Sequence, residues 1–137
     1  MTKLMLIGLA AFILFIILDL AWFSFAGDFF KAQIGSIARL SADGVWHVRY
    51  LPAALVYVFM AIGIVVFVLP NAESLSMAIL LGGLFGLVTY GMYDMTNLAT
   101  LRAWTYTFAI ADMTWGTFLS ATISGITYFL SRHSLLG

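Results

Sequence analysis

The sequence contains no cysteine, which excludes disulfide bonds, catalytic thiolates and cysteine-ligated metals. Charge is scarce as well, because Asp, Glu, Lys and Arg make up only 9% of the 137 residues. The six basic residues are scattered and balance the six acidic ones, so no nucleic-acid partner is expected. The only histidines, His47 and His133, are expected at opposite ends of the fold, which argues against a haem held by two histidines.

Apolar residues dominate what is present. They account for 64% of the chain, and the mean hydropathy is +1.08. These values are typical of an integral membrane protein, for which the lipid bilayer is the first partner. At 137 residues the chain has room for one transmembrane domain and for no separate soluble domain.

Four long apolar runs predict four membrane-spanning helices. At ~1.5 Å per residue, a run of about twenty residues crosses a hydrocarbon core of ~30 Å. Lys3 precedes the first run as in a signal peptide, but the length of the run and the presence of Asp19 favour a retained helix. The runs lack the alternation of a membrane β-barrel. We therefore expect an all-α integral membrane four-helix bundle, a single domain of residues 1–137 with spans at about 4–26, 50–69, 75–95 and 105–130.

The connection between the first two spans, residues 27–49, is the most polar part of the chain. Its apolar residues recur at helical spacing, while Asp28, Lys31 and Arg39 fall mostly on the other side. This pattern predicts an amphipathic segment that lies along the membrane interface. The segment either packs there or forms a lid over a polar site.

Three aspartates lie within or at the ends of the apolar runs: Asp19, Asp94 and Asp112. A charged residue at the bilayer centre costs roughly 2.5 to 3.5 kcal/mol on insertion scales, so such residues persist where they pair, hydrogen-bond or face a polar cavity. In regular helices all three would lie ~10 to 12 Å from the same membrane face. We expect them to surround a common polar pocket.

Helical spacing places other residues on the same faces as these aspartates. The candidate ligand- or proton-binding residues are Asp19, Asp94, Asp112, Asn97, Tyr90, Trp22 and Trp115. Small residues repeat every four positions on the same faces and would allow helices to approach closely. The residues expected at such helix contacts are Gly82, Gly86, Gly116, Ser120 and Ser124.

Two neighbouring carboxyl groups share a proton or recruit a cation, and carboxylates beside indole rings can hold an organic cation. The structural alternative is that each aspartate only accepts hydrogen bonds and fixes helix packing. Arg102, Arg49 and His47 are candidate charge partners. The expected spans contain no lysine for a Schiff base, and no ligand spacing specifies a metal. We therefore expect no cofactor, no metal and no catalytic residue.

A distinctive string, Gly-Met-Tyr-Asp-Met-Thr-Asn-Leu-Ala-Thr-Leu, occupies residues 91–101 and is followed by Trp104. Together with residues 18–22 and 111–117, it resembles the bacterial membrane family catalogued as domain of unknown function 2177. That resemblance implies a four-helix protein of the bacterial inner membrane, with no established activity. The family usually shows Trp-Pro before the fourth span, whereas this chain has Trp104-Thr105.

These observations leave three function classes. The first is a small transporter or ligand-binding protein that handles protons or a small cationic solute, which favours a homo-oligomer because four helices make a thin wall. The second is a structural or accessory subunit of a membrane complex. The third is a lipid-modifying membrane enzyme, which would need a pocket that opens sideways. The sequence does not specify the ligand.

Overall fold

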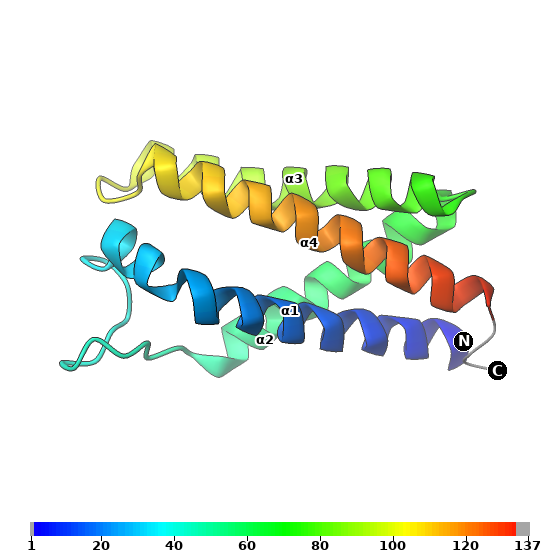
Figure 1. The fold of residues 1–137 in the computed structure, drawn as a ribbon, viewed down its shortest axis with the longest axis horizontal. Helices are drawn as coiled ribbons and strands as arrows, with labels where there is room; N and C mark the ends of the chain where they lie inside the picture. The colour runs from blue at the N-terminus through cyan, green and yellow to red at the C-terminus, as the bar shows by residue number, and fades with distance from the viewer. Residues whose placement is uncertain (1, 134–137) are drawn as a thin grey trace.

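The computed structural model describes residues 2–133, and in that range the chain forms an all-α bundle of four helices. Figure 1 shows α3 and α4 side by side, with α1 beneath α4 and α2 crossing behind α1. The sequence-based expectation of an all-α fold is confirmed. The helices are α1 (Thr2–Ile34), α2 (Tyr50–Gly63), α3 (Leu75–Thr100) and α4 (Tyr106–Arg132).

Three stretches of the described chain are long and apolar enough to cross a membrane: Lys3–Ile34, Tyr50–Asn71 and Leu75–Thr100. α4 has 27 residues, which is also a sufficient length, but its many Ser, Thr and Gly residues lower its hydropathy. Much of this polarity is turned inward, since Ser120, Ser124 and Thr127 are fully buried. The arrangement as one domain with four spans stays a prediction.

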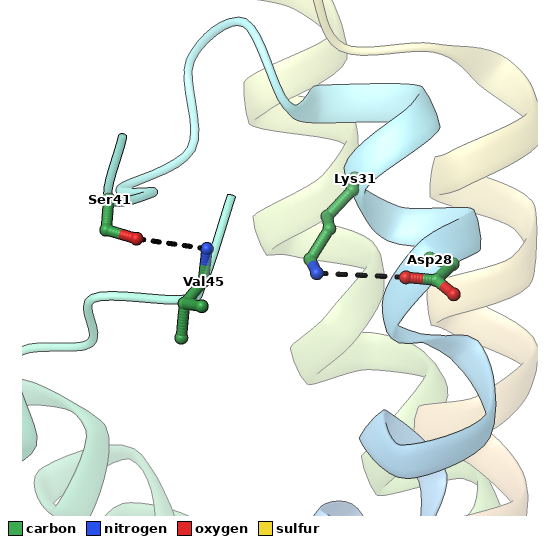
Figure 2. Close-up of polar contacts among 4 residues, drawn as sticks. All are labelled: Asp28, Lys31, Ser41 and Val45. Carbon is green, nitrogen blue, oxygen red and sulfur yellow. Dashed lines mark hydrogen bonds and ion pairs between the residues drawn. The ribbon is translucent and has the colours of Figure 1, made fainter. Parts of the chain in front are cut away.

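α1 extends eight residues beyond the expected end of the first span. The helical part of the amphipathic segment is therefore continuous with α1 as far as Ile34, and residues 35–49 form turns and extended chain. Asp28 and Lys31 do not interrupt the helix, because they lie one turn apart on its exposed side and form an ion pair of 3.7 Å (Figure 2).

A tight turn follows α1 and reverses the chain. The Ser41 amide donates to the Val45 carbonyl at 2.8 Å, and the Val45 amide donates to Ser41 Oγ at 3.1 Å (Figure 2). Gly44 has a φ of 74°, a left-handed conformation that glycine adopts without steric cost. The turn is closed by an antiparallel bridge between Leu40 and Trp46, which brings Trp46 back toward the bundle.

The second span changes its helical form before it ends. α2 passes into a π-helical segment, η1 (Ile64–Val68), and then into a 3-10 turn, η2 (Leu69–Asn71). Pro70 has no amide hydrogen to donate, so a regular α-helix cannot continue through it. α3 meets the second span at this end, where η1 lies and where Gly63 packs against Phe85.

α3 and α4 form the closest pair of helices. Ser74 caps the start of α3 and Thr105 the start of α4, each side chain accepting an amide hydrogen bond at 3.1 Å. Thr105 thus starts α4 in place of the proline that the family resemblance would lead one to expect. Small residues then allow the backbones to approach, as Gly82 faces Ser124 and Gly86 faces the Gly116 carbonyl.

Candidate functional site

Asp19 joins three helices through its two carboxylate oxygens. The Tyr57 hydroxyl of α2 donates to Oδ2 at 2.6 Å, and the Trp115 indole of α4 donates to Oδ1 at 2.9 Å. The residue is only 8% exposed. Because both oxygens have donors, Asp19 holds α1, α2 and α4 in register, whatever else it does.

The pattern Asp-x-x-Trp occurs twice, at residues 19–22 in α1 and 112–115 in α4, and the two copies meet across these helices. The rings of Trp22 and Trp115 stack with their centroids 4.5 Å apart and an angle of 7° between their planes. Trp115 thereby serves the aspartate of the other motif, Asp19, and not Asp112 in its own. The relation is not reciprocal, since the buried Trp22 Nε1 has no hydrogen-bond partner within the described chain.

Asp94 is the most deeply buried aspartate of the three, with no exposed surface. The Trp104 indole donates to its Oδ1 at 3.1 Å, whereas Oδ2 receives no hydrogen bond from any described donor. The carboxyl group of Asp112 lies within hydrogen-bonding reach of Asp94. A bond between two carboxyl groups requires a proton on one of them, so this geometry suits a pair that shares one proton.

A cavity of about 380 Å³ lies beside this pair, between α1, α2, α3 and α4. Asp19 and Asp112 are its two carboxylates, and eight of its fourteen lining residues are aromatic. Among the described residues that form the wall, none is Lys, Arg or His. The aromatic residues are Trp22, Phe23, Phe30, Trp46, Tyr90, Tyr93, Trp104 and Phe108.

The three aspartates therefore do not all face one pocket. Asp19 and Asp112 line the cavity, and Asp94 stands behind Asp112. No three His, Asp or Glu side chains in residues 2–133 lie close enough together to hold a metal ion. The cavity thus offers two acidic groups and aromatic side chains to an occupant.

The other predicted site residues divide into those near the cavity and those away from it. Tyr90, Trp22 and Trp115 belong to the cavity or to the stack beside it. Asn97 lies next to Tyr93 and is not part of the wall.

The three candidate charge partners do not reach the aspartates. His47, Arg49 and Arg102 are exposed, and the described part of the chain contains a single ion pair, Lys31–Asp28. These side chains lie at the ends of the helices, where they reach water more readily than the interior. The acidic groups of the site are therefore without a basic neighbour in the range 2–133.

The predicted packing residues occupy the contact between α3 and α4. A Cβ on Gly86 would collide with Ser120, and one on Gly116 would collide with the ring of Tyr90. The hydroxyl oxygens of Ser120 and Ser124 are buried without a partner among the described atoms. These residues hold Tyr90 against α4 and so fix one wall of the cavity.

Tyr57 is the main residue that sequence reasoning missed. It lies seven residues after Tyr50, where α2 begins, and Asp19 lies seven before Ala26. The argument from depth that grouped the aspartates would also have placed Tyr57 at the level of Asp19. Phe30 and Phe108 gave no such signal, because an apolar ring in an apolar run does not indicate which way it faces.

Comparison with known proteins gives one match. No curated protein and no solved structure matches the chain. The family model described as predicted membrane protein, DUF2177, matches residues 4–129. That range covers nearly all of the chain, including every helix that forms the cavity, so the protein belongs to this family of predicted membrane proteins of unknown function.

Proposed function

We propose that the protein binds a small organic cation in the cavity, and that it does so in the inner membrane of a bacterium. The observation that carries the proposal is the composition of the wall: two carboxylates, eight aromatic residues and no basic side chain among the described lining residues. An anionic or strongly polar ligand would find no complementary charge there. A cation would find both an opposite charge and ring faces.

The physical chemistry of the wall favours an alkylated ammonium group. Such a cation is attracted to the faces of aromatic rings by about 0.5 to 2 kcal/mol per contact, depending on how fully water is excluded. Trp22, Trp46 and Trp104 provide indole rings, which are the strongest partners of this kind. The volume of about 380 Å³ falls within the usual range for small-molecule sites.

The Asp94–Asp112 pair adds an exchange with protons to this binding. Two buried carboxyl groups so close together cannot both be ionised without a compensating cation. The titratable groups around the pair are Asp19, Tyr90 and Tyr93, and none of them is a cation. In the absence of a ligand the pair keeps one proton. A cation that binds beside Asp112 supplies the compensating positive charge instead, and the proton is released.

Binding of tetramethylammonium to the purified protein in nanodiscs tests the proposal. Isothermal titration calorimetry should detect binding, and Asp112→Asn should weaken it by roughly tenfold or more, or ~1.4 kcal/mol. Asp28→Asn is the matched control, because it makes the same change on the outer side of α1, where the Asp28 side chain is fully exposed. If Asp112→Asn binds tetramethylammonium as well as the wild type does, the cation site is not in this cavity.

The same titration in two buffers of different ionisation enthalpy counts the protons. About one proton should be released per cation bound, since the pair holds one proton to be displaced. Binding without proton release would support the cation site but contradict the exchange of a proton for the cation.

A role as a structural or accessory subunit is the second candidate. It is favoured by the hydrogen bonds of Asp19, whose two oxygens each accept a bond from another helix. Under this alternative, the aspartates serve only helix packing within a larger complex, and no cation binds. Purification in mild detergent would then yield a second protein in fixed ratio, and Asp112→Asn would break that association.

A further inference from the structure

α2 and α3 both line the cavity, and the two helices approach each other only near η1. These helices meet at η1, where Gly63 contacts Phe85, and they diverge from there. Figure 1 shows α2 running diagonally, so that the end at Tyr50 lies well away from α3. The opposite wall is closed, because α1 packs against α4 there through Phe30 and Phe108, whose rings are 5.0 Å apart.

Three of the described residues in the cavity wall are exposed: Phe23 of α1 at 42%, and Val56 and Tyr93, which come from the two diverging helices. Val56 of α2 is 53% exposed and Tyr93 of α3 is 56% exposed, whereas Trp104 and Phe108, deeper in the wall, are buried. Val56 and Tyr93 both have a large apolar surface. An opening with such borders suits contact with hydrocarbon better than contact with water.

The depth of the opening agrees with its composition. Val56 lies six residues after the start of α2, and Tyr93 lies seven before the end of α3. At ~1.5 Å per residue, both are ~9 to 10 Å inside the helix ends. If the helix ends mark the membrane surface, the opening lies below the headgroups, at the level where acyl chains begin.

Two connections at this end of the molecule contribute to the cavity wall. The 35–49 connection runs from the end of α1 to the start of α2 (Figure 1), and its Trp46 adds to the wall beside α1 through an edge contact with Phe23. The 101–105 connection joins α3 to α4 and places Trp104 inside.

We propose that the cavity takes its ligand sideways from the lipid through the opening between α2 and α3, so that the ligand is an amphiphilic amine with an ammonium head and a hydrocarbon tail. This inference rests on the proposed cation site and adds to it the class of ligand and the route. The head reaches Asp112 and the indole rings, while the tail leaves between Val56 and Tyr93 and stays in the bilayer. Partitioning into the membrane, which becomes stronger with each CH₂ group of the tail, concentrates such a ligand at the opening.

Single thiols test the route, since the chain has no cysteine of its own. Thr89→Cys places a thiol in the cavity wall, and it is a conservative change because the Thr89 hydroxyl bonds only to carbonyls of its own helix. Val56→Cys places one at the opening and provides a second position. Ala42→Cys, in the exposed 35–49 connection, is the control that faces water.

Two methanethiosulfonate reagents are compared in nanodiscs, where water reaches both membrane faces. One carries an uncharged hydroxyethyl group and partitions into water, and the other carries a dodecyl chain and partitions into lipid. The dodecyl reagent should modify Thr89→Cys and Val56→Cys at least ~10-fold faster than the water-soluble one, and Ala42→Cys should show the reverse preference. If the water-soluble reagent modifies Thr89→Cys as fast as it modifies Ala42→Cys, the cavity opens to water and the lateral route is wrong.

Protection of the Thr89→Cys thiol then tests the class of ligand. Dodecyltrimethylammonium, below its micelle concentration, should slow the modification at a total concentration at least ~10-fold lower than tetramethylammonium requires. Equal protection by the two cations would contradict the proposal of an amphiphilic ligand but would still support the cation site. Fast modification by the dodecyl reagent with no protection by either cation would support the opening but overturn both the ligand class and the proposed function.

Discussion

Replacing Asp19 by alanine and by asparagine should have very different effects on stability. Alanine removes both acceptors, so the Tyr57 hydroxyl and the Trp115 indole lose their bonds of 2.6 and 2.9 Å. Asparagine can keep both bonds, but only in one orientation. Its Oδ1 must accept from Trp115, because an indole N–H cannot accept, and its amide nitrogen then donates to the hydroxyl oxygen of Tyr57.

The size of the effect follows from the number of bonds lost. Side-chain hydrogen bonds between membrane helices contribute ~0.6 kcal/mol on average and up to ~1.7 kcal/mol. Two lost bonds should therefore lower the free energy of unfolding of Asp19→Ala by about 1 to 3.5 kcal/mol. Asp19→Asn loses only the contribution of the ionised acceptor, so its loss should stay below ~1 kcal/mol.

Reversible unfolding in mixed micelles, followed by tryptophan fluorescence, measures these differences, because Trp115 changes its surroundings when α1 and α4 separate. In the wild type, Tyr57→Phe should lower the free energy of unfolding by the contribution of about one hydrogen bond. In Asp19→Ala the same change should have almost no effect, since the acceptor of the Tyr57 hydroxyl is already absent. The reasoning is refuted if Asp19→Ala is as stable as the wild type. It is refuted as well if asparagine and alanine destabilise the protein equally.

Three further predictions concern α3, α4 and the carboxyl pair. Gly86→Ala should destabilise the protein by about 1 to 3 kcal/mol in the same unfolding assay, because the added Cβ meets the neighbouring helix. Gly83→Ala is the matched control. A Cβ there makes ordinary contacts of 3.5 Å or more, so this variant should be neutral or stabilising. Trp104→Phe removes the donor to Asp94 Oδ1 and should lower the free energy of unfolding by ~0.6 to 1.7 kcal/mol. An unchanged free energy of unfolding would mean that this bond does not form in the membrane. Asp94→Asn should abolish proton release on cation binding, because the amide supplies a permanent donor to Asp112, and an unchanged calorimetric proton count would contradict the shared proton.

The helices could be predicted from the sequence because each is a long apolar run with a clear boundary. The expected starts at residues 50 and 75 coincide with the starts of α2 and α3, and α4 begins one residue after the expected 105. The first span is predicted to end at about residue 26, with the helical pattern after it in a separate interfacial segment, whereas α1 continues as one helix to Ile34. A polar residue on the exposed side of a helix does not end it, and Ile34 shows how far the helix continues.

The candidate site was less accessible to prediction, because helical spacing places residues on faces but does not determine which helix each face meets. Spacing put Asp112 and Trp115 on one face of α4, yet Trp115 donates to Asp19 of α1. It also grouped Asp94 with the other aspartates by depth, although Asp94 lies beside Asp112 and is not part of the cavity wall. Depth along the membrane normal can be read from the sequence, and helix rotation requires the structure.

The cavity lies along the seam between two helix pairs, α1–α2 and α3–α4. The α3–α4 pair is local in sequence, with a connection of residues 101–105, and its small residues let it form early. A chain whose two hairpins are inserted but not yet docked would therefore show native helix content without any binding site. The Trp22–Trp115 stack crosses this seam, and indole rings held rigidly in an asymmetric environment give a signal in near-ultraviolet circular dichroism. That signal reports the assembly of the site itself, which far-ultraviolet measurements of helix content would miss.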